Sequence, residues 1–345
     1  MSTPDGRVHF SIADIADTPH YYPLALDSAQ ERVLLTRLSE ADYRVSSFLD
    51  NRVVMPGMRT TWVPLGEIAI ASKHVKSRPL HFIFHSGHVG STLLSRLLDE
   101  LPGVLGLREP VPLRTLADDY DRLGLGGVAQ FNTRLATFLN LWSRGFKDTR
   151  AVVVKSTSIA SRLAPTLLGM ATQSRAVYLN VSLETYLATM LGSAAADEDI
   201  AAFGPLRAKR LSAMLQTALP EAKTRGEAIA LAWLTERLTQ QMAQSAAGAR
   251  VLAVDFDEML ADLPQTLARV TAHLELEAAP AEIAKLAKSV VLTRYSKAPE
   301  RHAFSQADRA ARLQNALRAN ADDVEKGKRF IAGLAARHPS VAAVL

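Results

Sequence analysis

Residues 82–94 read Phe82-Ile83-Phe84-His85-Ser86-Gly87-His88-Val89-Gly90-Ser91-Thr92-Leu93-Leu94. The first part is apolar and has the length of a strand, whereas the middle is a loop of small residues. A helical period begins at the end, where Leu93, Leu94, Leu97 and Leu98 fall on one face. The segment therefore predicts a strand, a glycine-bearing loop and a helix in direct succession.

A loop of this kind presents backbone N–H groups at the start of a helix. Those donors and the helix dipole bind phosphate or sulfate, and Gly87 and Gly90 let a ligand approach the backbone closely. Ser91 and Thr92 add hydroxyl donors. The pattern G-x-x-x-x-G-K-[ST] is not met, because it would need Gly at His85 and Lys at Ser91. A glycine-bearing turn without a ligand is therefore the alternative.

Longer helical patterns separate five apolar runs of strand length. These runs are Leu80–Phe84, Val104–Leu107, Ala151–Val154, Ala176–Leu179 and Val251–Val254. Short, nearly continuous apolar strands that alternate with helices indicate a parallel sheet covered by helices on both faces. We therefore expect an α/β domain over residues 79–345.

The two ends of the chain differ from this alternating part. Residues 1–78 read as an appended segment, in which the Ser-Ala-Gln-Glu sequence of residues 28–31 is a capping-box pattern. It predicts a short helix through residues 34–38. From about Ser305 onward, the sequence predicts two Ala-rich helices with Arg and Lys on their outer faces.

A long helix is predicted before the last apolar run. Leu231, Leu234, Leu238 and Met242 recur at helical spacing and form one apolar stripe. Packing against the sheet or a neighbouring helix explains such a stripe best.

The composition excludes several chemistries. The 345 residues include no cysteine, so disulfides, zinc–thiolate sites, iron–sulfur clusters and cysteine nucleophiles are ruled out. The net charge of +5 favours an anionic ligand, but the basic residues are dispersed and do not suggest a nucleic-acid partner. Without an apolar signal region or a spanning run of about 18 apolar residues, we expect a cytoplasmic protein with no membrane partner.

Polar residues follow the predicted strands at their carboxyl ends. Glu109 comes just after the second run, and Lys155 comes directly after the third. The fourth run leads into a helix that contains Thr189. Because open α/β sheets bind ligands at the carboxyl ends of their strands, these residues are candidates for one site.

From about Phe82 to Arg301, the sequence resembles the sulfotransferase family, particularly its bacterial and tyrosylprotein-type branch. His88–Leu94 is similar to the family's R/K-S-G-T-T-L-L loop, and Val251–Pro264 looks like its late strand followed by a Y-E-D-L…P segment. The resemblance implies a P-loop NTPase-like three-layer sandwich. It also implies binding of 3′-phosphoadenosine-5′-phosphosulfate (PAPS), or of its product PAP, and transfer of a sulfuryl group to a hydroxyl or amine acceptor.

The resemblance carries roles to matching positions. It implies that Glu109 is the general base and that Lys155 and His88 lie near the sulfuryl group. The residues that it implies for donor binding are Ser86, Gly87, His88, Gly90, Ser91, Thr92 and Thr189.

Two positions depart from the family pattern. His88 replaces the usual Lys or Arg of the loop, and Val181 replaces the Arg that holds the 3′-phosphate. Lys297 and Arg301 are candidate substitutes for that cation, although a solvated basic loop would also explain them.

Other interpretations stay open. Glu109 could instead form an ion pair with Arg108, Arg114 or Lys155. A nucleotide-dependent phosphotransferase and a non-catalytic anion- or nucleotide-binding protein are the alternative functions. We expect an acceptor that is a small molecule, a glycan or a peptide, and a possible homodimer. We expect no metal, because His81, His85 and His88 span a strand and a loop, where their side chains would diverge.

Overall fold

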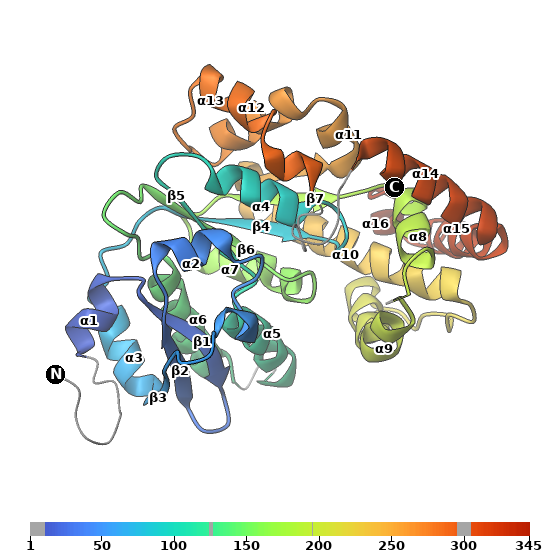
Figure 1. The fold of residues 1–345 in the computed structure, drawn as a ribbon. Helices are drawn as coiled ribbons and strands as arrows, with labels where there is room; N and C mark the ends of the chain where they lie inside the picture. The colour runs from blue at the N-terminus through green and yellow to red at the C-terminus, as the bar shows by residue number, and fades with distance from the viewer. Residues whose placement is uncertain (1–10, 124–126, 195, 295–304) are drawn as a thin grey trace.

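The computed structural model describes residues 11–345 except 124–126, 195 and 295–304. It contains an antiparallel three-stranded sheet near the N-terminus and a parallel five-stranded sheet, with helices on both faces of the latter (Figure 1). No helix in the described part of the chain is long and apolar enough to cross a membrane.

The five predicted strands form the parallel sheet. They are β4 (Leu80–His85), β5 (Val104–Arg108), β6 (Ala151–Lys155), β7 (Ala176–Asn180) and β8 (Val251–Asp255). The order is β5-β6-β4-β7-β8, so β4 and the loop that follows it lie at the centre of the sheet. The predicted α/β class with a central parallel sheet is confirmed, and each strand extends one residue beyond its predicted end.

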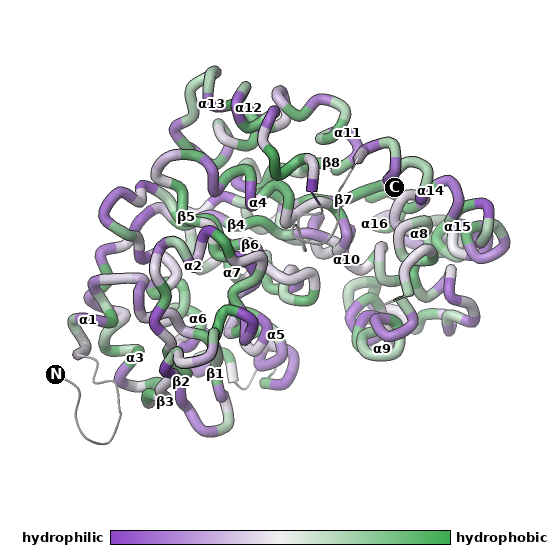
Figure 2. The backbone as a smooth tube through the Cα atoms, viewed as in Figure 1, coloured by the Kyte–Doolittle hydropathy of each residue, from purple (hydrophilic) through white to green (hydrophobic). Residues whose placement is uncertain are grey.

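Both faces of this sheet are buried, which explains the continuous apolar runs. Ile83 and Val153 belong to one core cluster, whereas their neighbours Phe82 and Val154 belong to the other. This alternation follows from the two-residue period of a strand. Figure 2 shows hydrophobic colour along these strands, which form the middle of three layers.

Helices cover the sheet and continue to the C-terminus. In chain order they are α4 (Ser91–Asp99), α5 (Val111–Leu123), α6 (Val128–Trp142), η3 (Ile159–Leu163), α7 (Ala164–Met170), α8 (Leu183–Leu191), α9 (Ala196–Leu215), α10 (Arg225–Ala247), η4 (Gly248–Arg250), α11 (Phe256–Ala261), α12 (Leu263–His273), α13 (Pro280–Leu286), η5 (Val290–Thr293), α14 (Gln306–Ala319), α15 (Ala321–Ala335) and α16 (Pro339–Ala342). The two predicted C-terminal helices are therefore confirmed as α14 and α15, with short α16 after them.

The N-terminal part packs on one face of the parallel sheet. Its elements are α1 (Ile12–Asp17), β1 (Tyr21–Asp27), β2 (Arg32–Arg37), α2 (Glu40–Val45), η1 (Asn51–Val53), β3 (Thr60–Pro64) and α3 (Leu65–Ser72). Val33 and Leu35 of β2 belong to the same buried cluster as Phe82 and Phe84 of β4. Residues 11–78 thus share a hydrophobic core with the α/β part.

The predicted helix over residues 34–38 is wrong, because residues 34–37 belong to strand β2, which forms a hairpin with β1. The Asp27 carboxylate accepts hydrogen bonds from the backbone N–H groups of Ala29 and Gln30 and forms the turn. Ser28 does not cap a helix, since its hydroxyl donates to the carboxylate of Asp119 at 2.6 Å. The alternating burial of Val33 and Leu35 outweighs the local capping pattern.

The predicted stripe on the long helix is confirmed only in part. Leu231, Leu234 and Leu238 of α10 are buried in the core. Met242 is 47% exposed, so the buried stripe ends before it.

Candidate functional site

The loop between β4 and α4 has an unusual backbone. Gly87, His88 and Gly90 have φ values of 94°, 55° and 69°, all in the left-handed region. A Cβ added at Gly90 would lie 2.0 Å from the ring of Phe256, so this position needs glycine for both conformation and space. The loop therefore keeps a fixed shape at the N-terminus of α4, where backbone N–H groups lack partners within the helix.

His85 connects this loop to the segment that follows the neighbouring strand β6. The Gly87 N–H donates to His85 Nδ1 at 3.1 Å, and His85 Nε2 lies 2.9 Å from the carbonyl oxygen of Ser156. Because Nδ1 accepts, Nε2 carries the proton and donates to Ser156. The His85 backbone N–H also donates to Ser161 Oγ at 3.1 Å. His85, which stands where the pattern G-x-x-x-x-G-K-[ST] has its first glycine, thus supports the loop.

A cavity of about 640 Å³ opens beside the loop, within the range of small-molecule sites. Helices α4, α8 and α14 and the first residue of α11 surround it. The residues that line it include His88, Gly90, Ser91, Thr92, Thr189, Phe256, Arg294, Arg309 and Arg312. Thr92 Oγ1 is buried and has no hydrogen-bond partner in the described part of the chain. An unpaired buried hydroxyl in a cavity wall is expected to bind a ligand or water.

The C-terminal helix α14 gives this cavity two arginines that the sequence prediction missed. The guanidinium of Arg309 lies 2.7 Å from Asp257 Oδ1 and 4.8 Å from the ring centroid of Phe256. Asp257 in turn accepts a hydrogen bond from Thr185 Oγ1 at 2.9 Å. Arg312 is exposed and lines the same cavity. Their spacing of three residues, which places them on one helix face, was the available signal, but on an Ala-rich helix it indicates a solvated surface equally well.

The other predicted donor-binding residues are distributed as follows. Thr189 lines the cavity, and its hydroxyl donates to the carbonyl of Thr185 at 2.7 Å. Ser86 is buried with no hydrogen-bond partner for Oγ in the described residues, but neither it nor Gly87 is among the residues that line the cavity. Lys297 and Arg301 lie outside the described residues.

Val181 is buried at 2% exposure within the core. Its carbonyl oxygen accepts a hydrogen bond from Trp233 Nε1 at 2.9 Å. This position therefore contributes no cation to the cavity.

Glu109 and Lys155 lie together at the carboxyl ends of β5 and β6. The Lys155 ammonium donates to the Glu109 carboxylate, so Lys155 is the ion-pair partner among the three alternatives. Lys155 is buried, whereas the Glu109 side chain is 20% exposed. A second cavity of about 420 Å³ is lined by Glu109 and Thr157 together with Asp50, Arg52 and Arg114.

Glu109 and the loop thus line different cavities, although the loop lies close to the segment that follows β6. A Cβ built at Gly87 would lie 3.6 Å from the side chain of Ser158, which follows Thr157. The loop after β4 and the segment after β6 therefore meet at Gly87 and Ser158, and each segment also contributes a residue to one of the two cavities.

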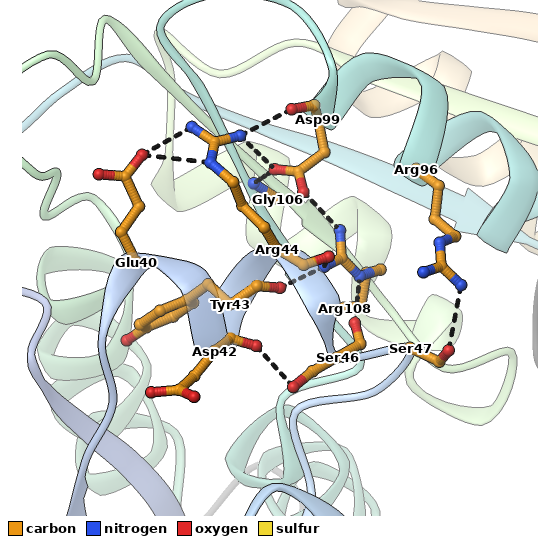
Figure 3. Close-up of polar contacts among 10 residues, drawn as sticks. All are labelled: Glu40, Asp42, Tyr43, Arg44, Ser46, Ser47, Arg96, Asp99, Gly106 and Arg108. Atoms are coloured by element: carbon orange, nitrogen blue, oxygen red, sulfur yellow. Dashed lines mark hydrogen bonds and ion pairs between the residues drawn. The ribbon is translucent and has the colours of Figure 1, made fainter. Parts of the chain in front are cut away.

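Arg108 does not pair with Glu109 and has a structural role. Its guanidinium pairs with Asp99 at 3.1 Å and donates to the carbonyl of Ser46 at 2.8 Å (Figure 3). Arg44 of α2 also approaches Asp99, at 3.7 Å. This buried network attaches α2 to the end of β5, directly before Glu109.

The three histidines around the loop have separate surroundings. His81 Nδ1 accepts from the backbone N–H of Arg175 at 3.2 Å, and burial lowers the pKa of His81 to about 4. His88 is exposed at the cavity. Across the described residues, no group of three or more His, Cys, Asp or Glu side chains is arranged to hold a metal ion.

No protein-family model matches this sequence, and no curated protein matches it. Solved structures do match. A sulfotransferase domain from the curacin biosynthetic pathway is 14% identical, with 71% of this chain and 98% of that chain covered and a TM-score of 0.39. The structural likeness is to sulfotransferases.

Two further matches come from complexes. The mouse sulfotransferase SULT7A1, complexed with PAP, is 11% identical over 73% of this chain and 88% of that chain, with a TM-score of 0.36. A retinol dehydratase, in complex with androsterone and the inactive cofactor PAP, is 12% identical over 81% of this chain and 87% of that chain, with a TM-score of 0.37.

Proposed function

We propose that this protein transfers a sulfuryl group from PAPS to a hydroxyl or amine acceptor. The observation that supports it is the first cavity, which is lined by the N-terminus of α4, with the buried, unpaired Thr92 hydroxyl, and by Arg309 and Arg312. Backbone N–H groups at a helix start and guanidinium groups both favour phosphate and sulfate. A donor with two separate anionic ends fits a cavity that offers N–H groups from the start of α4 and guanidinium groups from α14.

In this proposal the loop N–H groups, Ser91 and Thr92 hold the phosphosulfate end of the donor. Arg309 and Arg312 take the second phosphate, in place of the cation that Val181 cannot provide. His88, exposed at the same cavity, contacts the sulfuryl oxygens. The protein mainly positions the reactants and neutralises charge, as in phosphoryl transfer.

Glu109 receives the acceptor proton. The acceptor oxygen or nitrogen forms a bond to sulfur while the bond from sulfur to the phosphate oxygen breaks, and its electron pair leaves on that phosphate. The Lys155 ammonium, next to the Glu109 carboxylate, keeps positive charge at the end of β6 throughout. A general base of this kind contributes on the order of 10²–10⁴ in rate. The protein is proposed to act in the cytoplasm.

Calorimetric titration with 3′,5′-adenosine bisphosphate, ADP and ATP tests donor binding. We expect selective binding of the bisphosphate, with about tenfold weaker binding in Arg312→Ala and unchanged binding in Arg318→Ala, a control on the same helix that does not line the cavity. Thr189→Val should also weaken binding, whereas Thr133→Val, which removes a similar helical hydroxyl on α6, should not. Lys155→Ala tests whether the pair also supports the donor.

Two other outcomes would overturn the proposal. A preference for ATP would favour the phosphotransferase, and no nucleotide binding would favour a non-catalytic protein.

Glu109→Gln distinguishes a catalytic from a structural role of Glu109. Loss of a general base lowers kcat about 10²–10⁴-fold with unchanged bisphosphate affinity. If only the unfolding free energy changes, Glu109 is a structural partner of Lys155.

A further inference from the structure

The second cavity contains charged side chains, besides Glu109, that have no role in the proposed transfer. It lies at the junction of η1 and the N-terminal end of α5, and Glu109 forms part of its wall. Asp50 and Arg52 come from the N-terminal part of the chain, whereas Arg114 comes from the first turns of α5. The two parts of the molecule therefore build this cavity together.

Both carboxylates in its wall already have cationic partners. Arg52 Nε lies 2.8 Å from Asp50 Oδ1 and 3.0 Å from Oδ2, and its guanidinium stacks over the Phe48 ring at 4.1 Å. Glu109 is paired with Lys155. Asp50 and Glu109 are therefore neutralised within the fold and do not favour a cationic ligand.

Arg114 is the exception in this cavity. It is exposed, and no carboxylate of the described residues forms an ion pair with it. Its recorded contact is with the ring of Phe203, whose centroid lies 6.0 Å from the guanidinium carbon. One guanidinium thus remains uncompensated beside the carboxylate that is proposed to take the acceptor proton.

We propose that the acceptor carries an anionic group, a carboxylate or a phosphate, that binds Arg114 while its hydroxyl faces Glu109. This inference rests on the proposed function for the transfer itself, but the binding preference can be measured without a donor. Arg114 is a specificity residue here, because it contacts the remote end of the acceptor and not the reacting atoms.

The probes are 3- and 4-hydroxybenzoate and the corresponding neutral hydroxybenzamides. Binding to the full chain is followed by NMR titration, and Arg114→Gln is compared with Arg122→Gln. Arg122 lies on the same helix and pairs with Asp119. When the Arg122 guanidinium is removed, Asp119 still accepts hydrogen bonds from Arg134 and Ser28. We expect at least one acid to bind about tenfold more tightly than its amide, with the preference lost in Arg114→Gln and retained in Arg122→Gln.

Equal binding of each acid and its amide would overturn the inference, as would a preference that survives Arg114→Gln. With PAPS present, kcat/KM is expected to favour the acid over its amide by the same factor, and turnover of the amide should not change in Arg114→Gln. If the binding preference holds but no sulfuryl transfer occurs with any acceptor, the proposed function fails and the anion site stands.

Discussion

Lys155 and Glu109 are joined through both backbone and side chain. The Glu109 N–H donates to the Lys155 carbonyl at 2.7 Å, and the Lys155 ammonium donates to the Glu109 carboxylate. Glu109 adopts a left-handed backbone with φ of 56°, which is unfavourable for a residue with a side chain. The double connection holds this conformation and places the carboxylate at the ends of β5 and β6.

The ion pair predicts a strong coupling in stability. Lys155→Met should lower the unfolding free energy by about 2–4 kcal/mol, because it leaves the Glu109 carboxylate without its partner. In Lys155→Met/Glu109→Gln the loss should be smaller than the sum of the single losses, as denaturant unfolding of the four proteins would show. Strictly additive values would mean that the pair contributes no coupling.

Gly90 predicts a second effect. Gly90→Ala should destabilise the protein by about 2–4 kcal/mol, because it combines a left-handed conformation with overlap of the Phe256 ring. It should also weaken nucleotide binding, since the ring lines the same cavity. Gly169→Ala is the matched control, because Gly169 lies in α7 with open space around it and should gain about 0.5–1 kcal/mol. Thermal unfolding that ranks the two variants equally would contradict this explanation.

His85 predicts a measurable tautomer. Its Nδ1 accepts from Gly87 and its Nε2 faces the Ser156 carbonyl, so long-range ¹⁵N NMR should show a neutral ring with the proton on Nε2. His85→Phe leaves the Gly87 N–H and the Ser156 carbonyl without these partners and should cost about 1–3 kcal/mol. A ring with the proton on Nδ1 would rule out this role in the loop.

Much of the fold could be predicted from the sequence, because burial on both sides of the parallel sheet leaves a signal in every strand. The hairpin over residues 21–37 was missed for the opposite reason. Its alternating Val33 and Leu35 compete with a local capping pattern at residues 28–31, and only packing against the sheet decides between them.

The site was predicted less completely. The loop after β4 and the pairing of Lys155 with Glu109 were within reach, because both follow from strand ends. The roles of Arg309 and Arg312 could not be predicted from the sequence, because their place in the cavity depends on how α14 packs against α8. Contacts between segments more than 100 residues apart carry no local pattern.

His81 predicts how stability depends on pH. Burial lowers the pKa of His81 to about 4, whereas an unfolded histidine titrates near 6.5. Between those values the unfolded chain binds the extra proton, so the unfolding free energy should fall by about 3 kcal/mol as the pH drops from 6.5 to 4. Above pH 6.5 this contribution is fully present. Urea unfolding of the wild type and His81→Gln over this range isolates it, because carboxylates that titrate there affect both proteins alike. Parallel pH profiles would show that His81 has the same pKa in the folded and the unfolded protein. A steeper loss in the wild type would show that its buried ring stays neutral in the folded protein.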